Sequence, residues 1–113
     1  MTNHLDTFFS AIADPTRRAV VETLIRGPAT VGTLHAPHDI ALPTFLRHLK
    51  VLETAGLVRS HKTGRVRTVH IEAAPLGEAE RWLTRQRQLW EGRVDRLADL
   101  AEELEKIDRK DTE

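Results

Sequence analysis

The sequence contains no cysteine among its 113 residues. A disulfide framework, a thiolate zinc site and thiol redox chemistry are therefore excluded. No apolar run approaches the roughly 20 residues that a membrane-spanning helix needs. The first nine residues, MTNHLDTFF, do not show the basic, apolar and small-residue order of a secretory signal. We therefore expect a cytoplasmic protein with no membrane partner, whose stability comes from packing.

Signatures of catalysis are scarce as well. The two serines, Ser10 and Ser60, do not lie in a recognisable nucleophile elbow, and there is no glycine-rich phosphate loop. His35, His38 and Asp39 are residue types that bind zinc or nickel. A proline interrupts the segment between them, however, and no fourth ligand is nearby. We predict a protein that is not an enzyme, with no catalytic residues, no metal site and no cofactor.

The charges balance to a formal net charge of zero, but their distribution along the chain is uneven. Between residues 44 and 70, six arginines and lysines face one acid, Glu53, whereas the segment from 99 to the end has seven acids and three bases. We interpret the acidic tail as a solvated face. The basic segment falls on elements of defined geometry, and we expect it to be a binding surface.

Apolar residues that recur every three or four positions predict five helices. Asp14 and Thr30 are suited to cap the second and third helices, and Gly56 is suited to end the fourth. Because Ala41 cannot cap the fourth helix, we expect Asp39 to do so. The helices are predicted within residues 1–13, 15–26, 30–36, 42–55 and 75–108.

A β-hairpin is predicted within residues 57–72, where LVRSHK and RVRTVHIE flank a tight turn at Thr63 and Gly64. Helices followed by such a hairpin describe a winged helix-turn-helix, which is mainly α with a small β-hairpin. We expect one domain over residues 1–113. Residues 15–72 form its DNA-binding core, with the wing at about 57–72.

The predicted DNA contacts lie on the outer face of helix 42–55 and on the wing. A helix fits the major groove, and wing cations can reach phosphates or the minor groove, gaining affinity by releasing counterions. Two assignments have alternatives: His48 packs and fixes the helix, or it contacts DNA, and Leu46 packs inward or meets a thymine methyl group. The predicted contacts are Pro43, Thr44, Leu46, Arg47, His48, Lys50, Arg59, Lys62, Arg65 and Arg67.

An apolar stripe follows the last predicted helix at intervals of seven residues. It is too long for so small a protein to cover, and a two-fold interface explains it best. We therefore predict a homodimer formed by helices 1–13 and 75–108. Alternatively, Trp82 and Trp90 line an inducer pocket. The predicted interface residues are Leu5, Phe8, Phe9, Ile12, Leu83, Trp90, Leu97 and Leu104.

Two stretches, AIADPTRRAVVETLIRGPATVGTL and LPTFLRHLKVLETAGLVRSHKTGRVRTVHIE, resemble the ArsR-type bacterial winged-helix repressors. The resemblance extends over residues 5–107. It implies a homodimer that binds an imperfect palindrome near its own promoter and blocks transcription until a signal releases it. The ligand patterns of metal-sensing members are missing, which indicates a branch that does not sense metals. The inducer, a small molecule or a protein, is left open, as are the operator and the regulated genes.

Leu46 departs from the family, where serine or threonine is usual at the groove-facing position. The operator of this protein is therefore expected to differ from those of its relatives. The main alternative function is a winged helix that binds another protein without reading DNA, because a fold alone does not determine function. The basic wing favours nucleic acid.

Overall fold

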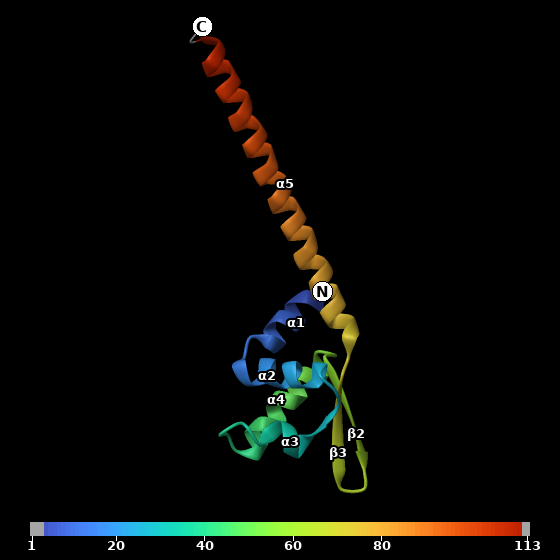
Figure 1. The fold of residues 1–113 in the computed structure, drawn as a ribbon. Coiled ribbons are helices and arrows are strands. Elements are labelled where there is room, and N and C mark those ends of the chain that lie inside the picture. The colour runs from blue at the N-terminus through green and yellow to red at the C-terminus, as the bar shows by residue number, and fades with distance from the viewer. Residues whose placement is uncertain (1–3, 112–113) are drawn as a thin grey trace. The chain divides into compact units, whose positions relative to one another are not determined.

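The computed structural model describes residues 4–111, which form five helices and a three-stranded antiparallel sheet (Figure 1). The chain folds into two compact units, the first ending at Ala79 and the second beginning at Glu80. This mostly helical fold with a small hairpin confirms the predicted fold class. The elements are α1 (His4–Ile12), α2 (Pro15–Ile25), β1 (Ala29–Thr30), α3 (Val31–His35), α4 (Leu42–Thr54), β2 (Val58–Thr63), β3 (Val66–Ile71) and α5 (Ala73–Asp111).

Two of the predicted helix caps are present. The Asp14 carboxylate accepts a hydrogen bond of 3.0 Å from the backbone N–H of Arg17 at the start of α2. The Thr30 hydroxyl accepts one of 3.2 Å from the N–H of Thr33 at the start of α3. In each case a side-chain oxygen satisfies a first-turn donor that has no partner within the helix.

The predicted cap of α4 by Asp39 is wrong. Ala41 precedes the helix in an extended conformation, and no side chain makes a capping hydrogen bond. Pro43 lies in the first turn, where its missing N–H leaves one donor fewer to satisfy. The first turn of α4 therefore keeps unpaired N–H groups.

The C-terminal end of α4 is closed by a Schellman motif. The N–H of Leu57 donates to the carbonyl of Leu52, and the N–H of Gly56 donates to the carbonyl of Glu53. The donor–acceptor distance is 3.0 Å in both hydrogen bonds. Gly56 adopts a φ of 76°, which side chains with a Cβ disfavour. Leu52 and Leu57 are fully buried, so the motif directs the chain from the helix into the wing.

The sheet has the strand order β1-β3-β2, and β2 pairs with β3 from Val58↔Ile71 to Thr63↔Val66. The connection therefore consists of Gly64 and Arg65, one residue later than the predicted turn. Gly64 has a φ of 61°, as the first residue of a type II′ turn requires. Strand β1 was not predicted, because its two residues become a strand only by pairing with β3.

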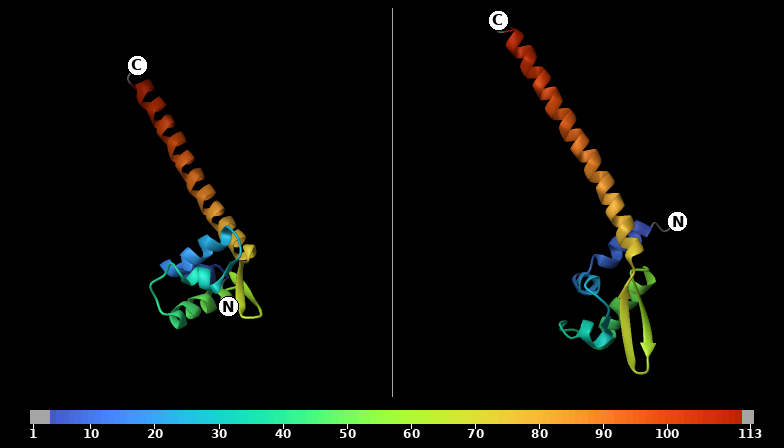
Figure 2. Two further views of the ribbon diagram at one scale, coloured as in Figure 1. Left: turned by 60° about the horizontal axis from the view of Figure 1, so that its bottom comes forward. Right: turned by 45° about the vertical axis from the view of Figure 1, so that its right-hand side comes forward.

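The hydrophobic core lies in the first unit. The innermost side chains come from α2, α4 and the base of the hairpin, including Phe45, Leu52 and Val69. From His61 to Arg67 the hairpin side chains are exposed, and Figure 2 shows the hairpin as a separate ribbon beside the helices. The wing is thus anchored at its base, and its tip faces solvent.

Helix α1 divides its apolar residues between the core and the surface. Phe8 is 6% exposed and fills the core, while Leu5 and Ile12 are half-buried against it. Phe9 is 37% exposed. Phe8 therefore packs within its own protomer instead of serving as the predicted dimer contact, because a buried ring offers little surface to a partner. Residues 1–3 of the predicted segment 1–13 lie outside the described residues.

In the second unit, α5 continues without a break from Glu80 to Asp111. Leu83, Trp90, Leu97 and Leu104 are each more than half exposed in the single chain. Within residues 4–111, no helix is both long and apolar enough to cross a membrane.

Candidate nucleic-acid interface

Helix α4 presents two different faces. Phe45, Leu49 and Leu52 point into the core, and this apolar side fixes the rotation of the helix. The opposite side is exposed and carries, among others, Arg47 and Lys50. Pro43 and Thr44 are exposed at its N-terminal turn as well. The sequence-predicted residues of α4 therefore form one accessible surface, except His48.

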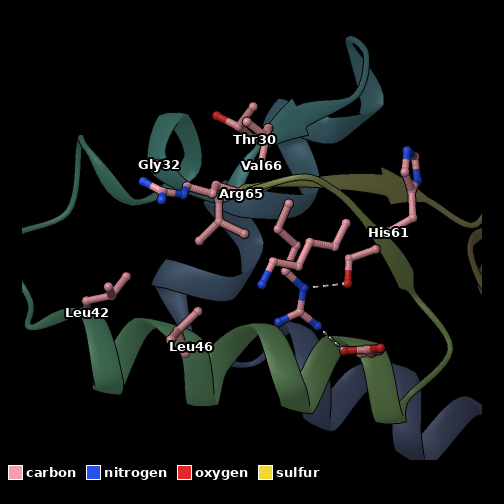
Figure 3. A pocket seen from close by; sticks show the side chains of 12 residues that line it. Thr30, Gly32, Leu42, Leu46, His61, Arg65 and Val66 are labelled. Carbon is pink, nitrogen blue, oxygen red and sulfur yellow. Dashed lines mark hydrogen bonds and ion pairs between the residues drawn. The ribbon is translucent and has the colours of Figure 1, made fainter.

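A hollow of about 870 Å³ separates α4 from the wing (Figure 3). Leu42 and Leu46 point into it from α4, while Arg65 and Val66 border it from the hairpin tip. The hollow combines an apolar floor with a basic rim. The complete lining is Thr30, Val31, Gly32, Leu42, Leu46, Glu53, Ser60, His61, Lys62, Arg65, Val66 and Arg67.

Leu46 is 37% exposed and does not belong to the buried core. Its neighbours in the hollow include Leu42 and Val66, which are also exposed apolar residues. A ligand entering the hollow would therefore meet a small apolar patch. Of the two alternatives for Leu46, the structure shows an outward position rather than a place in the core.

Two of the predicted DNA-binding arginines are engaged within the protein. The Nε of Arg59 lies 2.8 Å from a carboxylate oxygen of Glu72, next to the base of the wing. Arg67 donates from Nε to the hydroxyl of Ser60 over 2.9 Å, and its Nη2 lies 3.6 Å from a carboxylate oxygen of Glu53 (Figure 3). The predicted basic patch is therefore partly neutralised.

The other predicted cations have no internal partner among residues 4–111. In the part of the chain that the structure describes, the side chains of Arg47, Lys50, Lys62 and Arg65 make no hydrogen bond or ion pair. Arg47 and Lys50 lie on α4, Lys62 and Arg65 at the wing tip. These four charges are available to an anionic partner, two on the exposed face of α4 and two at the wing tip.

Lys50 also borders a second depression, of about 450 Å³, which lies between α4 and α1. Asp6 and Ser10 of α1 and Val51 of α4 contribute to its walls. Lys50 is thus placed at the edge of α4 that faces α1, whereas Leu46 faces the wing. The predicted contact residues consequently spread across the full outer width of α4.

His48 is held by the loop that enters α2. Its Nδ1 lies 3.1 Å from Nη1 of Arg17 and 3.9 Å from a carboxylate oxygen of Asp14. Because a guanidinium only donates, Nδ1 is the acceptor of this hydrogen bond. This contact supports the packing alternative for His48. The guanidinium of Arg17 also donates to the carbonyls of Ser10 and Ala11.

Asp14 has a pKa below its ordinary value. Partial burial raises the pKa, but the hydrogen bond from the N–H of Arg17, the nearby His48 and the N–H of Thr16 together lower it further than burial raises it. The carboxylate is therefore the favoured form, and it combines helix capping with electrostatic contact to Arg17.

The candidate metal ligands are used for packing. His35 Nε2 lies 2.7 Å from the carbonyl oxygen of Ile40, and the ring centroids of His35 and His38 lie 5.1 and 5.8 Å from that of Phe45. Residues 4–111 contain no group of three or more histidines and acids that could hold a metal ion.

The sequence interpretation missed several residues that line the hollow. Val31 and Gly32 come from α3, and Ser60 and His61 come from the middle of β2. Glu53 could have been identified from the sequence, because it is the one acid between residues 44 and 70. A lone acid among six bases suggests an internal partner, but not which base.

Known proteins resemble this chain in sequence and in structure. A helix-turn-helix domain model matches residues 12–61. The transcriptional regulator Rv2034 of Mycobacterium tuberculosis is 41% identical over 71 residues, which cover 63% of this chain and 66% of that protein. The transcriptional repressor SdpR of Bacillus subtilis is 28% identical over 79 residues, covering 70% of this chain and 88% of that protein.

The crystal structure of the ArsR family transcriptional regulator RHA00566 matches with a TM-score of 0.75 and 53% sequence identity. The match covers 79% of this chain and 98% of that one. This chain therefore belongs to the ArsR family of winged helix-turn-helix transcriptional regulators, which are DNA-binding proteins and not enzymes.

Proposed function

We propose that this regulator is a homodimeric repressor of its own operon, released by a small-molecule or protein inducer. It binds an imperfect palindrome with α4 in the major groove and the wing, β2 and β3, on the flanking DNA. The observation that carries the proposal is the exposed face of α4 beside a hollow that Lys62 and Arg65, two cations without an internal partner in the described chain, line from the wing. The name of SdpR, a transcriptional repressor, favours repression over activation.

The charges suit a duplex better than a protein surface. Lys62 and Arg65 line the open hollow from the wing tip, and Arg47 lies on the exposed face of α4. Each phosphate neutralised by such a cation releases counterions, and log K falls with log salt by about 0.9 per contact. Arg47 is also placed to read a base edge, because it projects from the face of α4 opposite the core.

The dimer is proposed from the second unit. Leu97 and Leu104 are exposed in the single chain although they lie on one stripe of α5. A second copy of the chain would cover this stripe symmetrically. Two reading helices related by a two-fold axis would then meet half-sites about 34–36 Å apart, which is one turn of DNA.

The dimer can be tested with Leu97→Glu and Leu104→Glu together. These residues lie outside the buried core, so we expect a folded monomer by light scattering with unchanged unfolding of the first unit. The matched control is Gln88→Glu with Ala98→Glu, which adds the same charge elsewhere on α5. A variant that stayed dimeric would show that another surface forms the interface.

DNA binding can be tested with the duplex from upstream of the protein's own gene. We expect fluorescence anisotropy to show binding that falls steeply with salt, and random duplex to compete poorly. A footprint should protect two half-sites and their flanks. Equal affinity for every duplex, with a shallow salt dependence, would instead indicate a winged helix that binds protein, and the proposal would be wrong.

A further inference from the structure

Glu53 is in an unusual position for a DNA-facing surface. It lies in the last turn of α4, and among the described residues that line the hollow it is the one acid. A carboxylate in this place repels phosphates and by itself would weaken DNA binding, the proposed function on which this inference rests. The surrounding residues therefore have to compensate for its charge.

Arg67 provides that compensation from the opposite wall. It lies on β3, and its guanidinium reaches Ser60 on β2 over 2.9 Å and Glu53 on α4 over 3.6 Å (Figure 3). One side chain thus joins both strands of the wing to α4. Within residues 4–111, this is the one polar side-chain contact between the hairpin and α4.

The location of the contact determines what it can do. The hairpin is held in the core at its base by Val58 and Val69, but the residues toward its tip are exposed. Arg67 pairs with Lys62 in the strand register, two residues beyond Val69 toward the tip. The ion pair therefore lies outside the core, where it can set the angle between the wing and α4.

We infer that Arg67 is a positioning residue of the wing and not a phosphate contact. It neutralises Glu53 within the hollow and holds the hairpin against the last turn of α4. Both partners are partly exposed, with 49% and 37% of their side-chain surfaces accessible. Such a pair contributes little to folding stability, so its removal should change DNA binding without unfolding the protein.

The test uses full-length protein and the upstream duplex, with three variants. Arg67→Glu places two acids together, and we expect it to weaken binding by about tenfold or more. The exchanged pair, Glu53→Arg with Arg67→Glu, restores opposite charges and should return affinity to within about fivefold of the wild type. Hydroxyl-radical protection of the flanking DNA should be lost in the first variant and regained in the second.

The third variant separates positioning from a direct contact, because an arginine at position 53 could itself meet DNA. Glu53→Gln with Arg67→Ala removes both charges, and we expect the slope of log K against log salt to stay at the wild-type value. A direct phosphate contact would instead lower that slope by about one. Arg65→Ala serves as the comparison, since its side chain has no internal partner in the described chain and should lower the slope.

The outcomes distinguish this inference from the proposed function. If wild-type protein binds the upstream duplex but the exchanged pair binds no better than Arg67→Glu, the inference is wrong and the proposed function stands. The same holds if the uncharged double variant loses about one unit of salt slope. If the wild-type protein binds no duplex specifically, both are wrong. Circular dichroism melts verify that every variant is folded.

Discussion

Replacement of Leu46 by alanine should affect DNA reading more than folding. Removing three fully buried carbons costs roughly 2.4 kcal/mol, at about 0.8 kcal/mol per carbon. Leu46 is 37% exposed and lies in the hollow, so the expected loss of unfolding free energy is about 1.5 kcal/mol or less. Leu49→Ala is the control on the same helix, because Leu49 is buried and its truncation should cost roughly 2–5 kcal/mol.

The effect on DNA follows from the apolar character of the site. Leu46 cannot hydrogen-bond a base edge, but with Leu42 and Val66 it offers an apolar surface that a thymine methyl group can contact. We expect Leu46→Ala to lose on the order of 1 kcal/mol of discrimination at one thymine of each half-site. Replacing that thymine by uracil should produce the same loss with wild-type protein and little further loss with the variant.

Two measurements decide the matter: equilibrium urea unfolding of both leucine variants and anisotropy with operators scanned from thymine to uracil. The reasoning would be refuted if Leu46→Ala were as destabilising as Leu49→Ala and left the base preference unchanged. That result would mean that Leu46 contributes to the core and not to the surface that reads DNA.

Three further substitutions test the cap and the free cations. Asp14→Ala should lower the unfolding free energy at pH 7 by about 1 kcal/mol. Because the pKa of Asp14 is lowered in the folded protein, the difference in unfolding free energy between wild type and variant should shrink as pH falls below about 3.8. A difference that persisted in urea melts at acid pH would exclude the carboxylate charge as its source. Arg65→Ala should weaken binding to all duplexes alike and lower the salt slope by about one; an unchanged slope would remove the wing tip from the interface. Arg47→Ala should also blur the choice of operator, and a uniform loss in a base-by-base competition assay would make it a phosphate contact only.

The local features of the fold could be predicted from the sequence. Helix periodicity, together with Asp14, Thr30 and Gly56, located the helices, because capping and glycine conformations depend on residues only a few positions apart. The strand at Ala29 and Thr30 could not be predicted. Two residues are too short for an alternating pattern, and their conformation depends on pairing with residues almost forty positions away.

The candidate site was predictable in its position but not in its electrostatics. The exposed face of α4 followed from its buried face, since both result from one helical period. The ion pairs of Arg59 and Arg67 could not be deduced, because Glu72 and Glu53 reach them only through the folding of the hairpin. The same limitation applied to Phe8, because a helical period marks an apolar side without showing whether its own chain or a partner covers it.

The contacts of Arg17 connect the N-terminal helix to α4, the proposed reading helix. Its guanidinium is planar, and its N–H groups keep fixed directions toward the carbonyls of Ser10 and Ala11 and toward the ring of His48. A displacement of the end of α1 relative to α4 strains or breaks these hydrogen bonds. One side chain of α2 thus links the N-terminal helix to the orientation of the helix that we propose meets DNA.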